Sequence, residues 1–307
     1  MKNIIQVKNL TKKYGKLIAV NDISFLVKKG EIFGLLGENG AGKTTTLEII
    51  EGLRPATFGK VKILGIDVKK GFKNIKEKIG VQLQSSAYFN FLNLKEILDL
   101  FGSFYQQRLN SKQLLKMVGL KEKAKSYISN LSGGQRQRFS IIASLINDPE
   151  IVFLDEPTTG LDPLARRNLW QIISEIKKQG KTIVLTTHYM EEAEILCDRV
   201  AIMEQGKILT MGETHALVEK LKNPFKIMTT ASQLTNPIKS EISQHSQIIP
   251  VPGKSHAYEI RCKFQKCLNK SITALEKINP ESLTVGKATL EDVFIELTGK
   301  TISDEGE

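Results

Sequence analysis

The sequence has few of the features that cross-link a chain or anchor it in a membrane. It contains three cysteines in 307 residues, an odd number without a paired motif, which fits a reducing compartment and not a disulfide framework. No uninterrupted apolar stretch approaches the roughly 18 residues of a membrane span, and the first residues do not begin a signal peptide. With 41% apolar residues, we expect an ordinary packed core.

Acidic residues are also in deficit, and the net charge is +11. Residues 221–307 hold 11 basic and 10 acidic side chains, so nearly all of the excess belongs to residues 1–220. A solvated surface explains such an excess, and a basic face held near an anionic inner leaflet is the more specific interpretation. The sequence shows no recognisable nucleic-acid module, and we expect no nucleic-acid partner.

One glycine-rich segment fits the pattern G-x-x-x-x-G-K-[ST] and reads Gly37-Glu38-Asn39-Gly40-Ala41-Gly42-Lys43-Thr44-Thr45. It lies between an apolar run at 32–36, which predicts a buried strand, and a predicted helix at 44–50. Its glycines permit a tight turn that aims the helix N-terminus at phosphates. Lys43 would contact the β- and γ-phosphates, and the Thr44 hydroxyl would bind Mg²⁺. The segment therefore predicts a nucleoside triphosphate site.

Two adjacent carboxylates, Asp155 and Glu156, follow a second continuous apolar run at 151–154. Such a run is typical of a parallel strand, and ligands of open α/β sheets bind where these strands end. Asp155 can hold Mg²⁺, directly or through water, while Glu156 can polarise the water that attacks the γ-phosphate. A solvated Asp-Glu-Pro turn is the alternative.

A second glycine-rich element, Leu131-Ser132-Gly133-Gly134-Gln135, precedes another predicted helix at 135–143. It predicts a second helix N-terminus able to bind an anion, but no lysine follows it. One nucleoside triphosphate does not easily need two such sites from one chain.

Taken in order, these motifs resemble those of the ATP-binding cassette ATPases, the nucleotide-binding subunits of ABC transporters, over residues 1 to about 220. The resemblance implies that Tyr14 stacks on adenine, that Asp162 belongs to the D-loop and that His188 senses the γ-phosphate. Gln84 matches the glutamine that contacts Mg²⁺ and the attacking water; Gln82 is the less favoured alternative.

The resemblance also sets the full list of expected site residues, with ATP and Mg²⁺ as the ligands. The expected catalytic residues are Glu156, His188, Gln84 and Lys43, and the expected Mg²⁺ ligands are Thr44, Gln84 and Asp155. The expected ATP-binding residues are Tyr14, Gly37, Glu38, Asn39, Gly40, Ala41, Gly42, Lys43, Thr44, Thr45, Leu131, Ser132, Gly133, Gly134, Gln135 and Asp162.

The implied fold is an α/β P-loop cassette with a mixed sheet core, an antiparallel β subdomain and an α-helical subdomain at about 85–148. We expect this cassette to span residues 1–222 and a small C-terminal α+β domain to span 223–307, with strands at 258–262 and 282–285 and a helix at 266–278. The resemblance further implies that two cassettes pair head-to-tail around ATP, and a homodimer is the simpler choice.

The segment after Gln84 is the expected contact with a membrane permease. Tyr88, Phe89 and Phe91 place three aromatics in a predicted loop, and we expect them to dock a permease helix; packing inside the helical subdomain is the alternative. Downstream, an apolar stripe at helical spacing predicts a helix of about 15 residues whose stripe lies in the core. The stripe consists of Leu94, Ile97, Leu98, Phe101 and Phe104.

The C-terminal segment 289–299 resembles the tail of ABC subunits paired with ABC-2-type permeases, including multidrug and antibiotic exporters. The short distance of about 90 residues from Lys43 to Leu131 leaves no room for the long coiled coil of chromosome-structure relatives. The sequence thus predicts the ATPase subunit of an ABC exporter, peripheral at the cytoplasmic face of the membrane. The alternative is a non-transport ABC ATPase that acts on RNA or a soluble complex.

Overall fold

A computed structural model describes residues 2–83, 88–232, 234–251 and 253–299. The chain divides into two compact units, Met1–Glu213 and Thr214–Glu307, and this division falls a few residues before the expected boundary at 222. Among the described residues, no helix is both long enough and apolar enough to cross a membrane.

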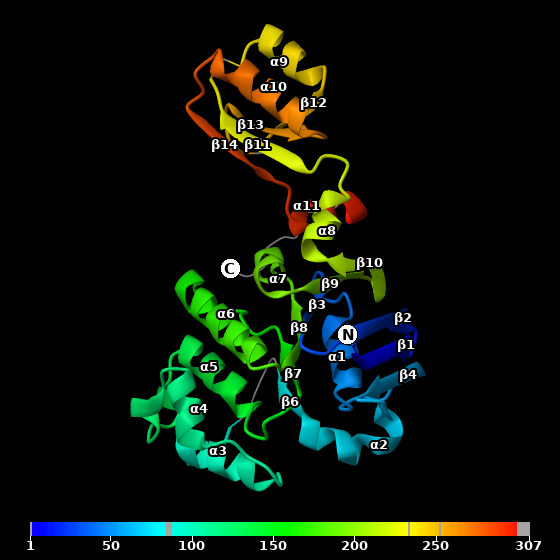
Figure 1. Ribbon diagram of the computed structural model, residues 1–307, viewed down its shortest axis with the longest axis vertical. Helices are drawn as coiled ribbons and strands as arrows, with labels where there is room; N and C mark the ends of the chain where they lie inside the picture. The colour runs from blue at the N-terminus through cyan, green and yellow to red at the C-terminus, as the bar shows by residue number, and fades with distance from the viewer. Residues whose placement is uncertain (1, 84–87, 233, 252, 300–307) are drawn as a thin grey trace. The chain divides into compact units, whose positions relative to one another are not determined.

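The first unit is built on a six-stranded sheet in the order β10-β9-β3-β8-β7-β6 (Figure 1). Its strands are β3 (Ile32–Leu36), β6 (Ile79–Gln82), β7 (Ile151–Asp155), β8 (Thr182–Thr187), β9 (Arg199–Glu204) and β10 (Lys207–Glu213). All neighbours pair in parallel except β10 with β9. Every residue of β3, β7 and β8 is buried, as continuous apolar runs predict for strands covered on both faces. The loops after β3, β8, β7 and β6 therefore leave the same edge of the sheet.

A second, antiparallel sheet has the order β2-β1-β4-β5. Its strands are β1 (Asn3–Tyr14), β2 (Leu17–Lys28), β4 (Phe58–Ile63) and β5 (Ile66–Asp67). Helix α1 (Lys43–Ile50) contacts strands of both sheets, and one apolar cluster unites them, with the rings of Phe25 and Phe33 stacked at 5.2 Å. The chain then forms α2 (Val68–Ile75) and the short 3₁₀ turn η1 (Lys76–Lys78) before β6.

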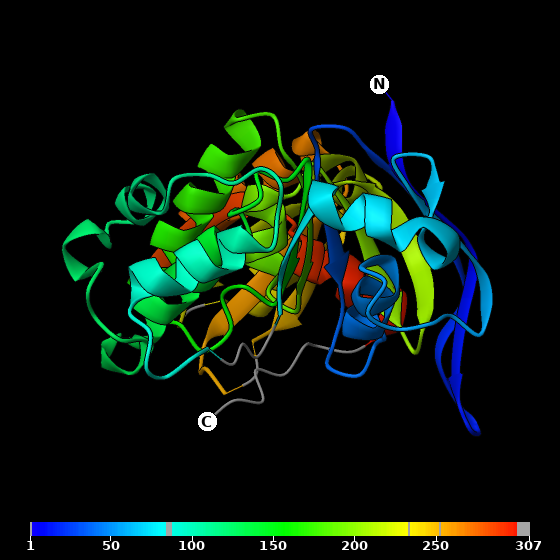
Figure 2. The ribbon, with the colours of Figure 1, turned by 90° about the horizontal axis from the view of Figure 1, so that it is seen from below.

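A helical part follows β6, and Figures 1 and 2 show it on the opposite side of the central strands from the antiparallel sheet. It contains α3 (Leu94–Ser103), α4 (Ser111–Met117), η2 (Lys121–Lys123), η3 (Ile128–Asn130) and α5 (Gly133–Ala143). The remaining helices of this unit are α6 (Pro163–Lys178) and α7 (Met190–Leu196).

Helix α3 differs from the prediction in its length and in the burial of the last residue of the apolar stripe. A capping box between Asn93 and Glu96 begins the helix, and Leu94, Ile97 and Leu98 are buried as expected. The helix ends at Ser103, however, so it is shorter than predicted, and the Phe104 side chain is 65% exposed. The end of the stripe therefore lies outside the core.

The second unit contains a split βαβ arrangement of the ferredoxin-like kind. Its elements are β11 (Phe225–Thr230), α9 (Asn236–Ser243), β12 (Ser246–Pro250), β13 (Ala257–Cys262), α10 (Gln265–Glu276) and β14 (Ser282–Lys287). The antiparallel sheet has the order β12-β13-β11-β14. Helices α9 and α10 contribute Ile242, Leu268 and Leu275 to a core shared with Ile227 and Ile260. The predicted small α+β domain is confirmed as a fold.

Two further helices in this unit, α8 (Thr214–Glu219) and α11 (Leu290–Thr298), contact each other. The buried carboxylate of Asp292 in α11 accepts hydrogen bonds from the Thr289 backbone N–H (2.8 Å), the Lys226 ammonium (3.2 Å) and the Arg261 guanidinium (3.3 Å). The exporter-like tail thus has a structural role, because Asp292 both caps α11 and links it to β11 and β13.

Candidate active site

The loop between β3 and α1 has the geometry of an anion-binding turn. Gly40 and Gly42 have φ of 81° and 97°, in the left-handed region that favours glycine. A Cβ on Gly42 would lie 2.3 Å from the carbonyl oxygen of Ala19, which excludes any side chain there. Gly42 is also the N-cap of α1, and no side chain of the described residues caps this helix. The first-turn N–H groups are therefore left for a ligand, as phosphate binding requires.

Lys43 is buried, and its ammonium group is surrounded by oxygen atoms. Nζ donates hydrogen bonds to the carbonyl oxygens of Gly37 (2.8 Å) and Glu38 (3.0 Å) and lies 3.4 Å from Glu156 Oε1. Burial lowers the pKa of Lys43, and the nearby Glu156 carboxylate opposes that shift. The loop thus fixes the ammonium beside the carboxylate at the edge of the sheet.

Asp155, at the end of β7, meets two hydroxyl groups. Its Oδ1 accepts hydrogen bonds from Thr44 Oγ1 (3.2 Å) and Thr186 Oγ1 (2.5 Å). Burial raises the pKa of Asp155, so a nearby cation would stabilise its ionised form. Carboxylate and hydroxyl oxygens are the hard ligands that Mg²⁺ prefers, and the set formed by Thr44 and Asp155 fits this ion.

Glu156 follows directly and has a strained backbone. Its φ is 45°, a left-handed conformation that non-glycine residues adopt mainly where function requires it. The Glu156 N–H donates to Thr186 Oγ1 (2.9 Å), and Oε2 accepts from Thr159 Oγ1 (3.2 Å). Nδ1 of His188, which follows β8, lies 3.5 Å from Oε2. This contact and the Lys43 ammonium lower the pKa of Glu156 to about 2 against the effect of burial, so the carboxylate is ionised at neutral pH.

Thr186 has a role here that the sequence analysis did not assign. Its hydroxyl contacts both the Asp155 side chain and the Glu156 backbone, and it is completely buried. In the parallel pairing of β7 with β8, Thr186 lies in register with Asp155. The strand contains three threonines, Thr182, Thr186 and Thr187, and only the strand register shows that Thr186 is the one that faces Asp155.

The second glycine-rich element begins α5. Ser132 is the N-cap, and its Oγ accepts from the Gln135 N–H (3.3 Å), while Gln135 Oε1 accepts from the Ser132 N–H (3.1 Å). A surface hollow of about 280 Å³ is lined by residues 132–135 together with Gly160, Leu161 and the α6 N-cap Asp162. None of the residues that line this hollow comes from the loop 37–45. The two anion-binding elements therefore form separate surfaces of the unit.

The other expected residues differ in what the structure says of them. Gln84 lies outside the described residues. Gln82 has a buried side chain that donates to the carbonyl oxygen of Leu83 (2.7 Å). Tyr14 is exposed at the end of β1, with Lys12 Nζ 5.0 Å and Arg54 Cζ 5.5 Å from its ring. The roles of these residues stay predictions.

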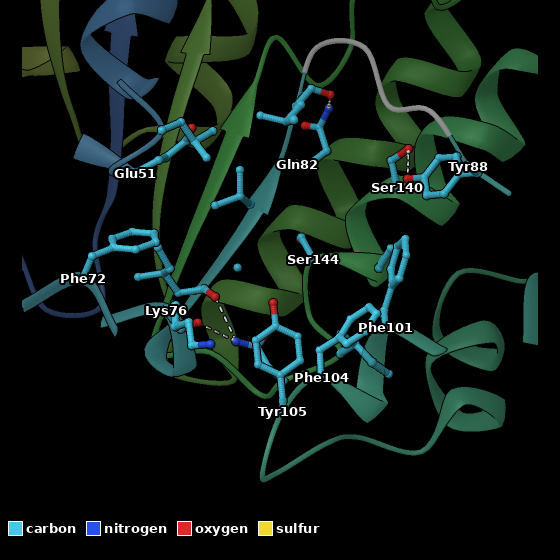
Figure 3. A pocket seen from close by; sticks show the side chains of 18 residues that line it. Glu51, Phe72, Lys76, Gln82, Tyr88, Phe101, Phe104, Tyr105, Ser140 and Ser144 are labelled. Carbon is cyan, nitrogen blue, oxygen red and sulfur yellow. Dashed lines mark hydrogen bonds between the residues drawn. The ribbon is translucent and has the colours of Figure 1, made fainter. Parts of the chain in front are cut away.

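A cavity of about 500 Å³, which we call the groove, is bordered by α2, η1, β6, α3 and α5 (Figure 3). Phe101, Phe104 and Tyr105 line one side of it. Tyr88 lines it as well, but the structure also packs this ring edge-on against Phe139 at 5.4 Å, and its hydroxyl donates to Ser140 (2.8 Å).

The other two predicted docking aromatics, Phe89 and Phe91, are 54% and 92% exposed. The three aromatics therefore differ: Tyr88 takes part in packing, whereas Phe89 and Phe91 are open to solvent.

These strand ends carry a phosphate loop, a buried lysine and acidic residues in the arrangement of a P-loop nucleoside triphosphatase. Comparison with known proteins shows that the chain belongs to the ABC transporter family, whose model matches residues 20–159. It is 36% identical to the linearmycin resistance ATP-binding protein of Bacillus subtilis over 98% of this chain and 100% of that protein. It is 34% identical to Nod factor export ATP-binding protein I of Burkholderia lata, over 98% of both chains.

Solved structures show the same fold. The ATP-binding subunit of an ABC transporter is similar with a TM-score of 0.63 and 29% identity, over 70% of this chain and 91% of that one. A cassette solved as a dimer in a post-hydrolysis state with ADP and Pi gives the same score and identity, over 68% and 98%. The predicted family, the α/β cassette fold and the ATPase activity are confirmed, and the chain is an ATP-hydrolysing transport subunit.

Proposed function

We propose that this chain powers a separate permease for export and acts at the cytoplasmic face of the membrane. The observation that carries the proposal is the alignment with export and resistance ATP-binding proteins over 98% of the chain, which includes the second unit.

In the proposed reaction the N–H groups of the loop 37–42 and the Lys43 ammonium bind the phosphates of ATP. Mg²⁺, held by Thr44 and Asp155, supplies positive charge to the phosphate oxygens when it is bound. Glu156, ionised because of its low pKa of about 2, accepts a hydrogen bond from the attacking water and orients it. His188, 3.5 Å from this carboxylate, keeps it in place.

Each ATP requires a second chain in this proposal. The hollow at Ser132 contains a helix N-terminus that can bind a phosphate, but none of the residues that line it comes from the loop 37–45. An ATP molecule that contacts both elements therefore lies between two chains. Head-to-tail pairing of two copies brings the loop 37–45 of one chain to the Ser132 hollow of the other. The relative solved as a dimer with ADP and Pi supports the pairing of two cassettes. ATP-driven closure and reopening of the dimer would be the mechanical output.

The groove is the proposed docking site for a cytoplasmic helix of the permease, and Phe89 and Phe91, which follow the lining residue Tyr88 in the chain, are proposed as further contacts. Exposed aromatic side chains are typical interface anchors. Phe91 is the better test residue, because its almost complete exposure separates docking from folding.

The experiment is to express tagged Glu156→Gln in the native cell and to recover it with ATP and Mg²⁺ from detergent-solubilised membranes. Mass spectrometry that identifies a polytopic membrane protein supports the proposal. Recovery of ribosomal, RNA-bound or soluble partners instead would overturn it in favour of a non-transport ATPase. Adding Phe91→Ala to the same chain should leave ATP binding intact and lower recovery of the membrane protein at least tenfold.

A further inference from the structure

Two buried oxygen acceptors in the groove have no hydrogen-bond partner among the described residues. Glu51, which ends α1, is 1% exposed, and its Oε1 accepts no hydrogen bond from the described residues. Gln82, 2% exposed, donates through its amide, but its Oε1 is likewise without a donor there. Both side chains line the groove, toward the same part of it in Figure 3. Buried acceptors in native proteins are almost always paired with a protein group or ordered water, so these two oxygens require a donor from outside the described residues.

The described chain offers Glu51 no cation. Lys76 also lines the groove but is exposed, and no hydrogen bond or ion pair joins it to Glu51 among the described residues. The charged groups that act on Glu51 are the acidic Asp155 and Glu48, which add to the effect of burial and raise its pKa to about 8. Glu51 also lies at the C-terminal end of α1, where the helix dipole favours a positive charge. The surroundings therefore favour a cation from outside.

Another part of the groove is lined by aromatic rings. Phe101 and Phe104 lie apart from Glu51 and Gln82 in the same view, and Phe104 presents a largely exposed ring. A ligand that satisfies both regions has an apolar face and one long basic side chain, as an amphipathic helix has. Arginine suits the two acceptors better than lysine, because its planar guanidinium presents several donors in a fixed fork.

We propose that Glu51 and Gln82 bind an arginine side chain of the permease helix that docks in the groove, while the apolar face of that helix packs on Phe101 and Phe104. This inference rests on the proposed function, since the permease is the occupant. Because Glu51 ends the helix that begins at Lys43, the arginine would be bound at the opposite end of the helix that contacts ATP. Helix α1 would then link the docked permease helix directly to the phosphate loop.

The test measures the affinity of the full chain for the detergent-solubilised permease identified above. Glu51→Gln and Glu51→Met should each raise the dissociation constant at least tenfold, whereas the exposed-carboxylate control Glu122→Gln should not change it. Glu51→Met should not lower the thermal midpoint, because it removes a buried carboxyl oxygen that has no hydrogen-bond partner among the described residues. Unchanged affinity in Glu51→Met overturns the inference. Absence of binding by the unsubstituted chain would instead count against the proposed function.

A double-mutant cycle then identifies the chemistry of the partner. Each arginine in the cytoplasmic helices of the permease is replaced by methionine and tested against the unsubstituted chain and Glu51→Met. One replacement should weaken binding at least tenfold with the unsubstituted chain and cause no further loss with Glu51→Met. If every arginine effect adds fully to that of Glu51→Met, arginine recognition is overturned.

Discussion

Replacing Glu51 by glutamine should make the first unit less sensitive to alkaline pH. The side chain is buried, and its pKa rises from an ordinary 4.5 to about 8 on folding. The folded state therefore binds the proton more tightly than the unfolded state does. This contribution to stability is fully present below pH 4.5 and is lost as pH rises through about 8.

The size of the effect follows from the pKa. Between pH 6 and the folded-state pKa of about 8, the carboxyl group is protonated in the folded state and ionised in the unfolded state. This interval spans about two pH units, and each unit lowers the unfolding free energy by about 1.4 kcal/mol. The unsubstituted chain should thus lose about 3 kcal/mol of unfolding free energy over this range relative to Glu51→Gln, which has no proton to lose.

The assay is urea unfolding followed by the fluorescence of Trp170, the one tryptophan of the sequence, which lies in α6 of the first unit. Glu122→Gln, at an exposed position, should follow the unsubstituted chain at every pH. A stability difference between Glu51→Gln and the unsubstituted chain that stays constant from pH 6 to pH 9 would refute the reasoning, because a group that titrates equally in both states cannot produce the slope.

Three further changes test other parts of the structure. Gly80→Ala should destabilise the first unit by about 3 kcal/mol or more in the same urea assay, since its Cβ would lie 1.8 Å from the Ser144 carbonyl oxygen. Asp292→Asn should destabilise the second unit by about 3 kcal/mol, because it removes a buried charge shared by Lys226 and Arg261; limited proteolysis should cleave this unit first, and an unchanged cleavage pattern would contradict the assigned contact. Thr186→Val should lower turnover at least tenfold while ATP binding persists, since it removes the hydroxyl that contacts Asp155 and Glu156; unchanged turnover in a hydrolysis assay would show that this hydroxyl does not position them.

The sequence was sufficient for those parts of the site that depend on local chemistry. The phosphate loop needs glycines at particular φ values, and buried parallel strands need continuous apolar runs, so both leave a readable pattern. Because such strands end at one edge of a sheet, Lys43, Asp155, Glu156 and His188 could be expected to meet there. The structure places them together.

Features that depend on distant contacts could not be read in the same way. Tyr88 and Phe91 are both aromatic and close in sequence, yet only the fold packs one against Phe139 and leaves the other exposed. The pattern of α3 could not show that Phe104 lies past the helix end. Nothing in the sequence marks Glu51, because its burial beside the acidic Asp155 and Glu48 depends on the surrounding fold.

The central claim is that two copies of this chain enclose ATP and that Glu156 then supports hydrolysis. The most direct measurement is light scattering of purified Glu156→Gln during size-exclusion chromatography, with and without ATP and Mg²⁺. We predict twice the single-chain mass of 34.3 kDa with ATP and the single-chain mass without it, together with loss of turnover. This mechanism is contradicted if the variant binds ATP but stays at the single-chain mass, or if it hydrolyses ATP at the unsubstituted rate.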